Sequence, residues 1–166
     1  MTTAPSAPAS NLQLDAQLCF ALYAASRSMT AIYRPLLEPL GLTYPQYLVM
    51  LVLWQRDGQS VRELGVSLLL DSGTLTPLLK RLQSAGLLNR QRRTQDEREV
   101  EIRLTKAGHQ LRERARDIPG CIAERIGMPI DPWIALRTEL RGLISRLNLA
   151  AAQPAAASPP TPGVQA

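Results

Sequence analysis

The stretch that decides the fold runs from Asp71 to Gly108 and reads DSGTLTPLLKRLQSAGLLNRQRRTQDEREVEIRLTKAG. Its first part carries apolar residues at the spacing of one face of an α-helix, namely Leu75, Leu78, Leu79 and Leu82. The pair Ala85-Gly86 then ends this helix. Two short extended segments follow, residues 87–93 and 99–104, separated by a polar and charged tip. The stretch therefore predicts a helix that leads into a basic β-hairpin.

A helix followed by a basic hairpin is the anatomy of a winged helix, which places the helix in the major groove of DNA and the hairpin beside it. The charge distribution agrees with this interpretation. Residues 80–116 hold 11 Lys/Arg and 5 Asp/Glu, a net charge of +6, whereas the whole chain carries +5. A solvated charged face is the plainer explanation of such a run, but a basic segment on a wing-like hairpin favours double-stranded DNA as the partner.

Helices are predicted on both sides of this unit. The almost wholly apolar run from Tyr44 to Gln55 predicts a buried helix with a proline in its first turn. Ser60 and Glu63 have the spacing of a capping box and predict the start of a third helix, in which Leu64, Leu68 and Leu69 face inward. The further predicted helices are residues 12–32, which end at Arg34-Pro35, residues 104–126, interrupted near 118–120, and residues 131–149.

The apolar stripes at the two ends of the chain are not needed to build a winged helix, so they must be buried elsewhere. A helical dimer interface built from both ends is the economical solution. We therefore predict a mainly α fold with a small β-wing, in one domain of residues 12–149. Its winged helix-turn-helix covers about residues 43–108, and its dimerisation helices cover about residues 12–34 and 109–149.

The two termini and the cysteine usage bear on the cellular compartment. Residues 1–11 and 150–166 are rich in Ala, Pro and Ser, and we expect both tails to be disordered. The N-terminus lacks the basic start and apolar core of a signal peptide, and no apolar run has the length of a membrane span. Two cysteines 102 positions apart do not form a disulfide framework. These features predict a cytoplasmic protein that is not bound to a membrane.

Two sets of residues resemble a known family. The triplet Asp96-Glu97-Arg98 at the hairpin tip, followed by Val100, Ile102 and the run LTKAG at residues 104–108, resembles the DNA-binding core of the MarR family of bacterial regulators. The run LCFALY at residues 18–23, with Tyr33 and Tyr44 downstream, resembles the organic hydroperoxide sensors of that family, and Cys121 resembles their two-cysteine type. The resemblance extends from about Leu14 to Leu149. It implies a homodimeric DNA-binding regulator, usually a repressor, and not an enzyme.

Five residues of the predicted recognition helix are candidates for DNA contact. Ser72, Thr74 and Thr76 place small hydroxyls near a helix N-terminus, which can approach bases and phosphates closely. Lys80 and Arg81 lie about one turn further on and suit phosphate contact. The structural alternative is that Ser72 merely caps the helix and Thr74 is solvated.

The hairpin adds Arg90, Arg92 and Arg98. The resemblance implies that Arg98 enters the minor groove while Asp96 holds its guanidinium in position, so that the arginine reads groove shape more than sequence. A surface salt bridge of no consequence is the alternative. A dimer with two such units predicts an operator that is an inverted repeat with half-sites about one helical turn apart.

The first helix contains the candidate sensor. Cys19 lies in its apolar stripe, where a lone cysteine is usually a small buried hydrophobe. Tyr23 shares the same face one turn on, whereas Tyr33 and Tyr44 reach the cysteine only through folding or from a partner subunit. Hydroxyl donors stabilise a thiolate relative to a thiol, and the thiolate is the species that attacks a peroxide oxygen.

The resemblance implies how such a sensor works. Cys19 becomes a sulfenic acid, Tyr33 and Tyr44 move, and Cys121 condenses with the oxidised cysteine across the dimer. A disulfide requires Cα atoms within about 7 Å. If they start farther apart, closing the bond shifts helices, changes the spacing of the two wings and releases DNA. The alternative for Cys121 is that it is a bystander.

Other functions remain open on these residues. One is a regulator that binds a small aromatic ligand in the dimer cleft while Cys19 is unreactive, and another is a thiol peroxidase that turns over with a reductant. Replacing Cys19 by serine discriminates among them. With one histidine, His109, and two distant cysteines, the chain cannot supply four zinc ligands, and we expect neither a metal nor a cofactor.

Overall fold

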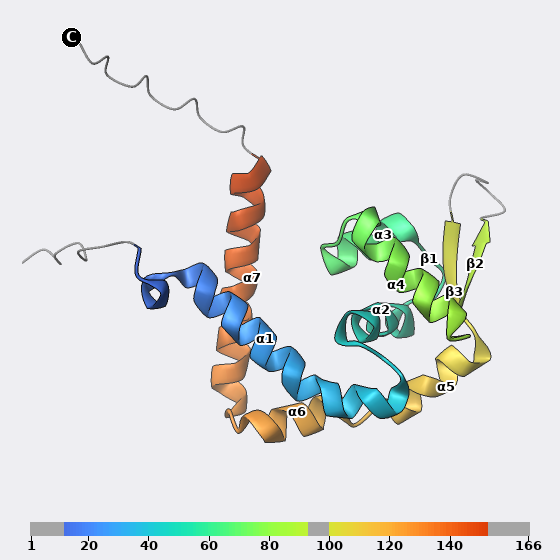
Figure 1. Ribbon diagram of the computed structural model, residues 1–166, viewed down its shortest axis with the longest axis horizontal. Coiled ribbons are helices and arrows are strands. Elements are labelled where there is room, and N and C mark those ends of the chain that lie inside the picture. The colour runs from blue at the N-terminus through green and yellow to red at the C-terminus, as the bar shows by residue number, and fades with distance from the viewer. Residues whose placement is uncertain (1–11, 93–99, 153–166) are drawn as a thin grey trace, which may run out of the picture. The chain divides into compact units, whose positions relative to one another are not determined.

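The computed structural model describes residues 12–92 and 100–152, and of Arg92 only the backbone. The chain divides into two compact units, Met1–Arg125 and Ile126–Ala166. Figure 1 labels the elements. The first unit contains η1 Leu14–Ala16, α1 Leu18–Leu37, η2 Glu38–Leu40, α2 Tyr44–Gln55, β1 Gln59–Ser60, α3 Val61–Leu68, α4 Ser72–Ser84, β2 Leu88–Arg92, β3 Val100–Leu104 and α5 Lys106–Arg114; α6 Ile118–Ile126 ends at the boundary, and α7 Ile130–Ala152 follows.

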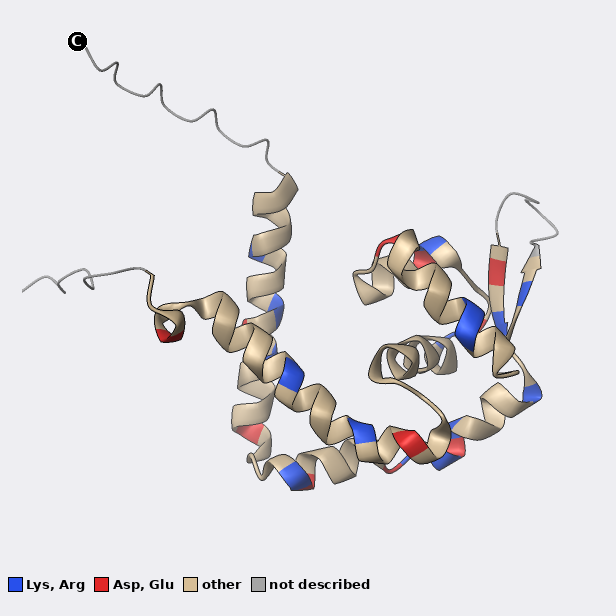
Figure 2. Cartoon of the chain, in the orientation of Figure 1, with Lys and Arg blue, Asp and Glu red and all other residues tan. Residues whose placement is uncertain are grey.

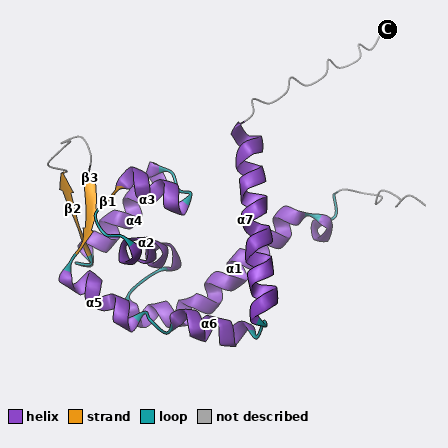
Figure 3. Ribbon diagram, turned by 180° about the vertical axis from the view of Figure 1, so that it is seen from behind, coloured by secondary structure: helices purple, strands orange, loops and turns teal. Residues whose placement is uncertain are grey.

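The predicted wing is present as an antiparallel pair, with Leu88 opposite Leu104 and Arg92 opposite Val100. A third strand, β1, was not predicted. It pairs Gln59 with Ile102, so that the sheet has the order β1-β3-β2. Figure 3 shows the strands together beside α3 and α4. The fold is mainly helical with a small sheet, which confirms the predicted class.

The core lies between the helices of the winged-helix part and the base of the hairpin. The helices α2, α3 and α4 contact one another, and α4 also contacts β2. Burying a large apolar side chain stabilises a fold by roughly 1.5–3 kcal/mol. The fully buried side chains here include Val49, Met50, Leu53, Leu64, Leu75, Leu79, Leu82, Leu88 and Ile102. The leucine face predicted for the recognition helix therefore builds the core, with Leu78 half-buried at its edge.

Capping explains where two of the helices begin. Thr43 and Gln46 form a capping box at the start of α2. Ser60 and Glu63 form the predicted box at α3, where the Ser60 hydroxyl accepts a bond from the Glu63 backbone N–H at 3.2 Å and the Ser60 N–H donates to the Glu63 carboxylate at 2.7 Å. These bonds satisfy N–H groups that the first helical turn leaves without partners.

Several expectations about helices are wrong. The first helix begins at Leu18 and not near residue 12, because Gln17 is extended and separates α1 from the short turn η1. The first helix continues past Pro35 to Leu37, because the loss of one proline N–H so near the end leaves the later bond from Glu38 N to Arg34 O intact. An irregular first turn is also expected in the recognition helix, because Pro77 lacks the N–H of an interior helical bond, but α4 is continuous from Ser72 to Ser84. Leu69 does not face inward: it is 64% exposed, because its left-handed backbone (φ 55°) ends α3 and turns the side chain away.

Another wrong expectation concerns the C-terminal tail. Residues 150–152 were expected to be disordered but continue α7, and their three alanines have the highest helix propensity. The rest of both predicted tails, residues 1–11 and 153–166, lies outside the described residues.

Two long helices bury little. In α1 only Leu37 is buried, while Leu18 near its start is 61% exposed. In α7 no residue is buried, and Leu136, Ile144 and Leu147 are exposed. Apolar stripes of this kind are normally covered by another surface.

No single helix in the described ranges is both long and apolar enough to cross a membrane. The bent pair Leu18–Leu40 and Tyr44–Gln55, with 70° between its parts, reaches that length and composition only when taken together. Its second part, α2, supplies buried side chains to the core.

Candidate DNA-binding surface and redox site

The N-terminus of α4 is capped by Asp71. One carboxylate oxygen accepts from the Thr74 backbone N–H at 2.8 Å, and the other accepts from the Thr74 hydroxyl at 3.0 Å. These bonds hold the pKa of Asp71 below its usual value. Ser72 is therefore not the cap, and its exposed side chain is open to other contacts. The Thr74 hydroxyl has given its hydrogen to the cap, so it can only accept from a further partner.

The remaining helix candidates differ in exposure. Lys80 and Arg81 are exposed, and Thr76 is half-buried. Figure 2 shows basic residues on α4 and on the hairpin beside it. The helix itself contains no acidic residue. A cationic surface thus follows α4 along the part of the helix that lies beyond its hydroxyl-bearing first turn.

The wing candidates are only partly described. Arg90 lies on β2 opposite Ile102 and is half-buried. Arg92 ends the strand, and Asp96 and Arg98 lie outside the described residues. The predicted minor-groove role of the hairpin tip therefore stays a prediction.

Asp57 anchors the root of the wing. One carboxylate oxygen accepts from Gly58 N at 2.8 Å and from Leu104 N at 2.9 Å, and the other lies 3.5 Å from His109 Nε2. The turn before β1 is thereby tied to the end of β3 and the start of α5. The Asp57-Gly58 pair signals a turn in the sequence, but nothing local indicates a bond to a backbone 47 positions away.

An aromatic cluster joins α1 and α2. The Tyr33 ring lies 4.7 Å from that of Tyr44 and 5.9 Å from that of Tyr47, between ring centroids. Tyr47 in turn lies 6.2 Å from Trp54, whose indole N–H donates to Gly108 O at 2.9 Å. Tyr47 was not among the predicted site residues, although it lies on the apolar run that predicted α2.

Burial determines the protonation state of this cluster. It raises the pKa of Tyr33 and of Tyr44, and it raises the pKa of Tyr47 to about 12 with a further contribution from the two neighbouring phenols. All three hydroxyls therefore keep their hydrogens at neutral pH. The structure brings Tyr33 and Tyr44 together as two adjacent hydrogen-bond donors.

Cys19 does not join them within one chain. It is exposed in the first turn of α1, and the 14 positions between Cys19 and Tyr33 correspond to about 21 Å along a helix axis. Tyr23, one turn from the cysteine, is 57% exposed and accepts a hydrogen bond from Arg27. Cys121 lies half-buried on α6, and both thiols are free. The predicted sensor residues thus form separate groups in a single copy.

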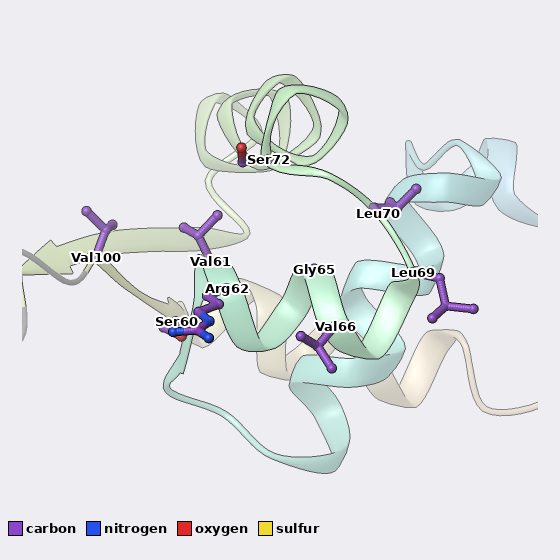
Figure 4. Close-up of a pocket in the computed structure, with 9 residues that line it drawn as sticks. All are labelled: Ser60, Val61, Arg62, Gly65, Val66, Leu69, Leu70, Ser72 and Val100. Carbon is purple, nitrogen blue, oxygen red and sulfur yellow. The ribbon is translucent and has the colours of Figure 1, made fainter. Parts of the chain in front are cut away.

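Three hollows on the described residues have neither Cys19 nor Cys121 in their lining. The first, about 760 Å³, lies between α3, the start of α4 and β3, and is lined mainly by apolar residues such as Val61, Val66 and Leu69 (Figure 4). The second, about 680 Å³, lies beside the tyrosine pair and has Tyr44, Thr30 and Arg34 in its lining. The third, about 420 Å³, lies between α2 and the α5–α6 segment and is lined in part by Tyr47, Trp54, Arg112, Arg116 and Pro119. The part of the chain that the structure describes holds no cluster of three His, Cys, Asp or Glu suited to a metal ion.

Sequence comparisons identify relatives. A family model, transcriptional regulator SarA/Rot, matches residues 31–114. The chain is 54% identical over 112 residues to the organic hydroperoxide resistance transcriptional regulator of Bacillus subtilis (strain 168), an alignment that covers 68% of this chain and 76% of the relative. It is 48% identical over 135 residues to the HTH-type transcriptional regulator TtmR of Methylorubrum extorquens (strain PA1), covering 81% and 69% respectively.

Solved structures of AbfR of Staphylococcus epidermidis are also similar. Reduced AbfR bound to DNA matches with a TM-score of 0.67 and 37% identity, covering 81% of this chain and 94% of AbfR. Disulfide-formed AbfR matches with a TM-score of 0.56 and 34% identity, covering 84% and 93%. These relatives are regulators, as expected for a chain without an enzymatic role. The chain therefore belongs to the MarR/SarA family of winged-helix, DNA-binding transcriptional regulators.

Proposed function

We propose that this protein is a homodimeric repressor that senses organic hydroperoxides through Cys19 and then releases its operator. One observation carries the proposal: Tyr33 and Tyr44 form a pair of donors that Cys19 of the same chain cannot reach along α1. A second copy completes the site by bringing its own Cys19 to this pair. The similarity to an organic hydroperoxide resistance regulator supports the choice of inducer.

The exposed helices supply the means of dimerisation. The segment formed by η1 and the first turn of α1 presents Leu14, Leu18 and Phe20, and α7 presents a further apolar stripe, none of it buried in one copy. Covering such stripes is the main driving force for association. In this proposal the ends of the chain, about residues 12–34 and 109–149, form the interface, and the winged helix of about residues 43–108 remains free to bind DNA.

The chemistry begins with the Cys19 thiolate, stabilised by hydroxyls of Tyr33 and Tyr44 from the partner copy and by its own Tyr23. A sulfur lone pair attacks the terminal oxygen of the hydroperoxide, the O–O bond breaks and an S–O bond forms. Two electrons pass from sulfur to the peroxide, giving a sulfenic acid and an alkoxide that takes a proton to become an alcohol. Tyr33 and Tyr44 then no longer face a thiolate, because the Cys19 sulfur has become a neutral sulfenic acid.

Cys121 resolves the oxidised state. Its thiol sulfur attacks the Cys19 sulfur, the S–O bond breaks and water leaves, and a disulfide forms across the dimer. Cys121 is half-buried on the short helix α6, and in this proposal α6 adjusts so that the two sulfurs meet. The disulfide-formed state of AbfR supports such a step in this family. A small-molecule dithiol then restores the two thiols.

DNA binding follows from the winged helix. Ser72 and Thr76 approach base edges and phosphates at the start of α4, Thr74 accepts from a donor on a base edge, and Lys80 and Arg81 contact phosphates. Arg90 and Arg92 contact the backbone beside the hairpin, and Arg98, positioned by Asp96, enters the minor groove. Two copies then read an inverted repeat with half-sites about one helical turn apart. The protein acts in the cytoplasm, where this DNA lies.

A second candidate is a regulator that responds to a small aromatic anion. The hollow between α2 and the α5–α6 segment favours it, because it is lined by Tyr47 and Trp54 together with Arg112 and Arg116, of which Arg116 is paired with Glu113. In that case Cys19 takes no part in the response. A thiol peroxidase has no comparable support, since the relatives are regulators.

Operator release tests the proposal. Reduced wild type, Cys19→Ser and Cys121→Ser are bound to a fluorescent operator duplex, and cumene hydroperoxide is added while anisotropy is recorded. Wild type should release DNA and rebind after dithiothreitol, and Cys19→Ser should stay bound. Cys121→Ser should form no disulfide between chains on a non-reducing gel, and in excess hydroperoxide its Cys19 should pass to the sulfinic acid, which dithiothreitol does not reduce. If Cys19→Ser released the operator as wild type does, the redox proposal would be wrong and a regulator that binds a small aromatic ligand would be favoured.

A further inference from the structure

One face of α1 carries a regular series that ends at Cys19. Cys19, Tyr23 and Arg27 follow at intervals of four residues, which places them one above another on the helix. Helical side chains lean toward the N-terminus, so each member extends over the one before it. The structure shows the upper half of this series: Arg27 Nη1 donates to the Tyr23 hydroxyl oxygen at 3.0 Å, and the guanidinium carbon lies 5.6 Å from the ring centroid.

This bond determines what the Tyr23 hydroxyl can still do. Its oxygen accepts from Arg27, so its own hydrogen remains available for an acceptor on the other side. The next group along the face toward the N-terminus is the sulfur of Cys19. A positive donor on the phenol oxygen also polarises the O–H bond and makes it a stronger donor in turn.

The charge of Arg27 has no counterpart on its own helix. Residues 18–37 contain two arginines and no aspartate or glutamate. Burial keeps the Tyr33 phenol on the same helix protonated at neutral pH, because it raises the pKa of that hydroxyl. The anion that α1 itself can provide for Arg27 is the Cys19 thiolate.

We propose that Arg27 is a positioning residue of the peroxide sensor, which orients the Tyr23 hydroxyl toward Cys19 and stabilises negative charge on its sulfur. This inference rests on the proposed function and adds a residue to it. It divides the sensor into an arginine–tyrosine pair from the same chain as the cysteine and a tyrosine pair from the other copy. A solvated surface arginine would have no effect on the reaction of Cys19.

The test measures the rate at which Cys19 is oxidised by cumene hydroperoxide in the full-length protein, with the sulfenic acid trapped by dimedone and counted by mass spectrometry. Arg27→Ala should react about tenfold more slowly, the equivalent of one charge-assisted hydrogen bond of about 1.4 kcal/mol. Arg27→Lys should recover most of the rate, because it keeps the charge. Arg62→Ala, which removes an exposed arginine of α3 in the winged helix, should react like wild type.

Two readouts separate positioning from general damage to the helix. The deficit of Arg27→Ala should be largest at pH 6 and shrink toward pH 9, where the thiolate forms without help. In a Tyr23→Phe background the arginine substitution should have no further effect, because the hydroxyl through which it acts is gone. Circular dichroism checks folding, and Arg27→Gln, a milder change, repeats the test if the alanine variant is unfolded.

Equal rates for wild type and Arg27→Ala, or additive losses in the double variant, would overturn the inference. Its failure is distinct from failure of the proposed function. If wild-type Cys19 itself does not react with the hydroperoxide, the sensor proposal fails. If wild type reacts and Arg27→Ala reacts equally fast, only the role of Arg27 is wrong.

Discussion

Gly108, in the first turn of α5, shows why a single residue type is required at the base of the wing. A Cβ atom here would clash with the backbone carbonyl oxygen of Leu87, which cannot move without displacing the start of β2. The carbonyl of Gly108 also accepts the bond from Trp54. The glycine thus allows the helix, the wing and the aromatic cluster to meet in one place.

Gly108→Ala should therefore destabilise the fold by about 1–3 kcal/mol, the usual range for overpacking in a rigid site. Operator affinity should fall as well, because the root of the wing is displaced. Urea unfolding and operator titration measure the two effects. Gly120→Ala adds the same methyl group in open space on α6 and should leave stability unchanged or raise it by up to about 1 kcal/mol. Equal effects of the two variants would contradict this account of Gly108.

Glu63 makes stability depend on pH. Its pKa is lowered from 4.5 to about 2, first by the backbone N–H of Ser60, then by the Ser60 hydroxyl and by Arg56. A lowered pKa means that the ionised carboxylate stabilises the fold above pH 4.5, and that this contribution is lost as the pH falls from 4.5 toward 2. The side chain is 37% exposed, so solvent screening keeps the effect small.

Glu63→Gln should consequently lose less stability than wild type between pH 5 and pH 2. Urea midpoints across this range measure the loss. Glu124→Gln, which neutralises an exposed carboxylate on α6, should follow the wild-type curve. A Glu63→Gln curve parallel to wild type would show that the capping box contributes nothing through its charge.

At the scale of elements, the recognition helix presents Lys80 and Arg81 as exposed charges beside a buried leucine face. If these two side chains bind phosphates, Lys80→Ala or Arg81→Ala should weaken binding to all sequences alike. Each should also reduce the slope of log affinity against log salt by about 1. Titrations of operator and scrambled duplexes at several salt concentrations measure both quantities. A loss confined to the operator would instead assign the residue to base recognition.

Local pattern predicted most elements because their causes are local. Leucine spacing predicted α4, the charged extended pair predicted the wing, and Ser60 with Glu63 predicted the start of α3. The features that were not predicted depend on contacts between residues far apart in the sequence or on the backbone conformation of one residue. Asp57 binds Leu104 N, and Arg114 donates to Pro39 O across 75 positions at 2.7 Å, neither of which any periodicity encodes. Leu69 was assigned to the core because its left-handed backbone leaves no mark on hydrophobic spacing.

Some residues of the candidate site could likewise be placed from the sequence, and others could not. Tyr23 and Cys19 could be placed on one face of α1 from their spacing, and the same helix geometry separates Cys19 from Tyr33. Tyr47 was missed because an aromatic residue in an apolar run is as consistent with a core as with a functional cluster. The pairing of Tyr33 with Tyr44 required the packing of α1 on α2, which only the structure describes.

At the scale of the whole molecule, the proposal requires two copies. Leu18→Glu should convert the dimer into a monomer, because it places a charge in the apolar start of α1, where Leu18 is 61% exposed in one copy. Sedimentation velocity measures the change. Val66→Glu is the matched control, since Val66 is 72% exposed but lies on α3 in the winged helix. A dimer that survives Leu18→Glu would place the interface elsewhere.

The most direct measurement of a sensor shared between copies uses a mixed dimer. One tagged chain carries Cys19→Ser, and the other carries Tyr33→Phe with Tyr44→Phe. The remaining Cys19 then lies on the chain that lacks the Tyr33 and Tyr44 hydroxyls, while the partner chain has both tyrosines intact. We predict that this cysteine reacts with cumene hydroperoxide at the wild-type rate per site, and much faster than in the Tyr33→Phe/Tyr44→Phe homodimer. A rate as slow as that homodimer's would contradict the account, because it would mean that each chain builds its sensor alone.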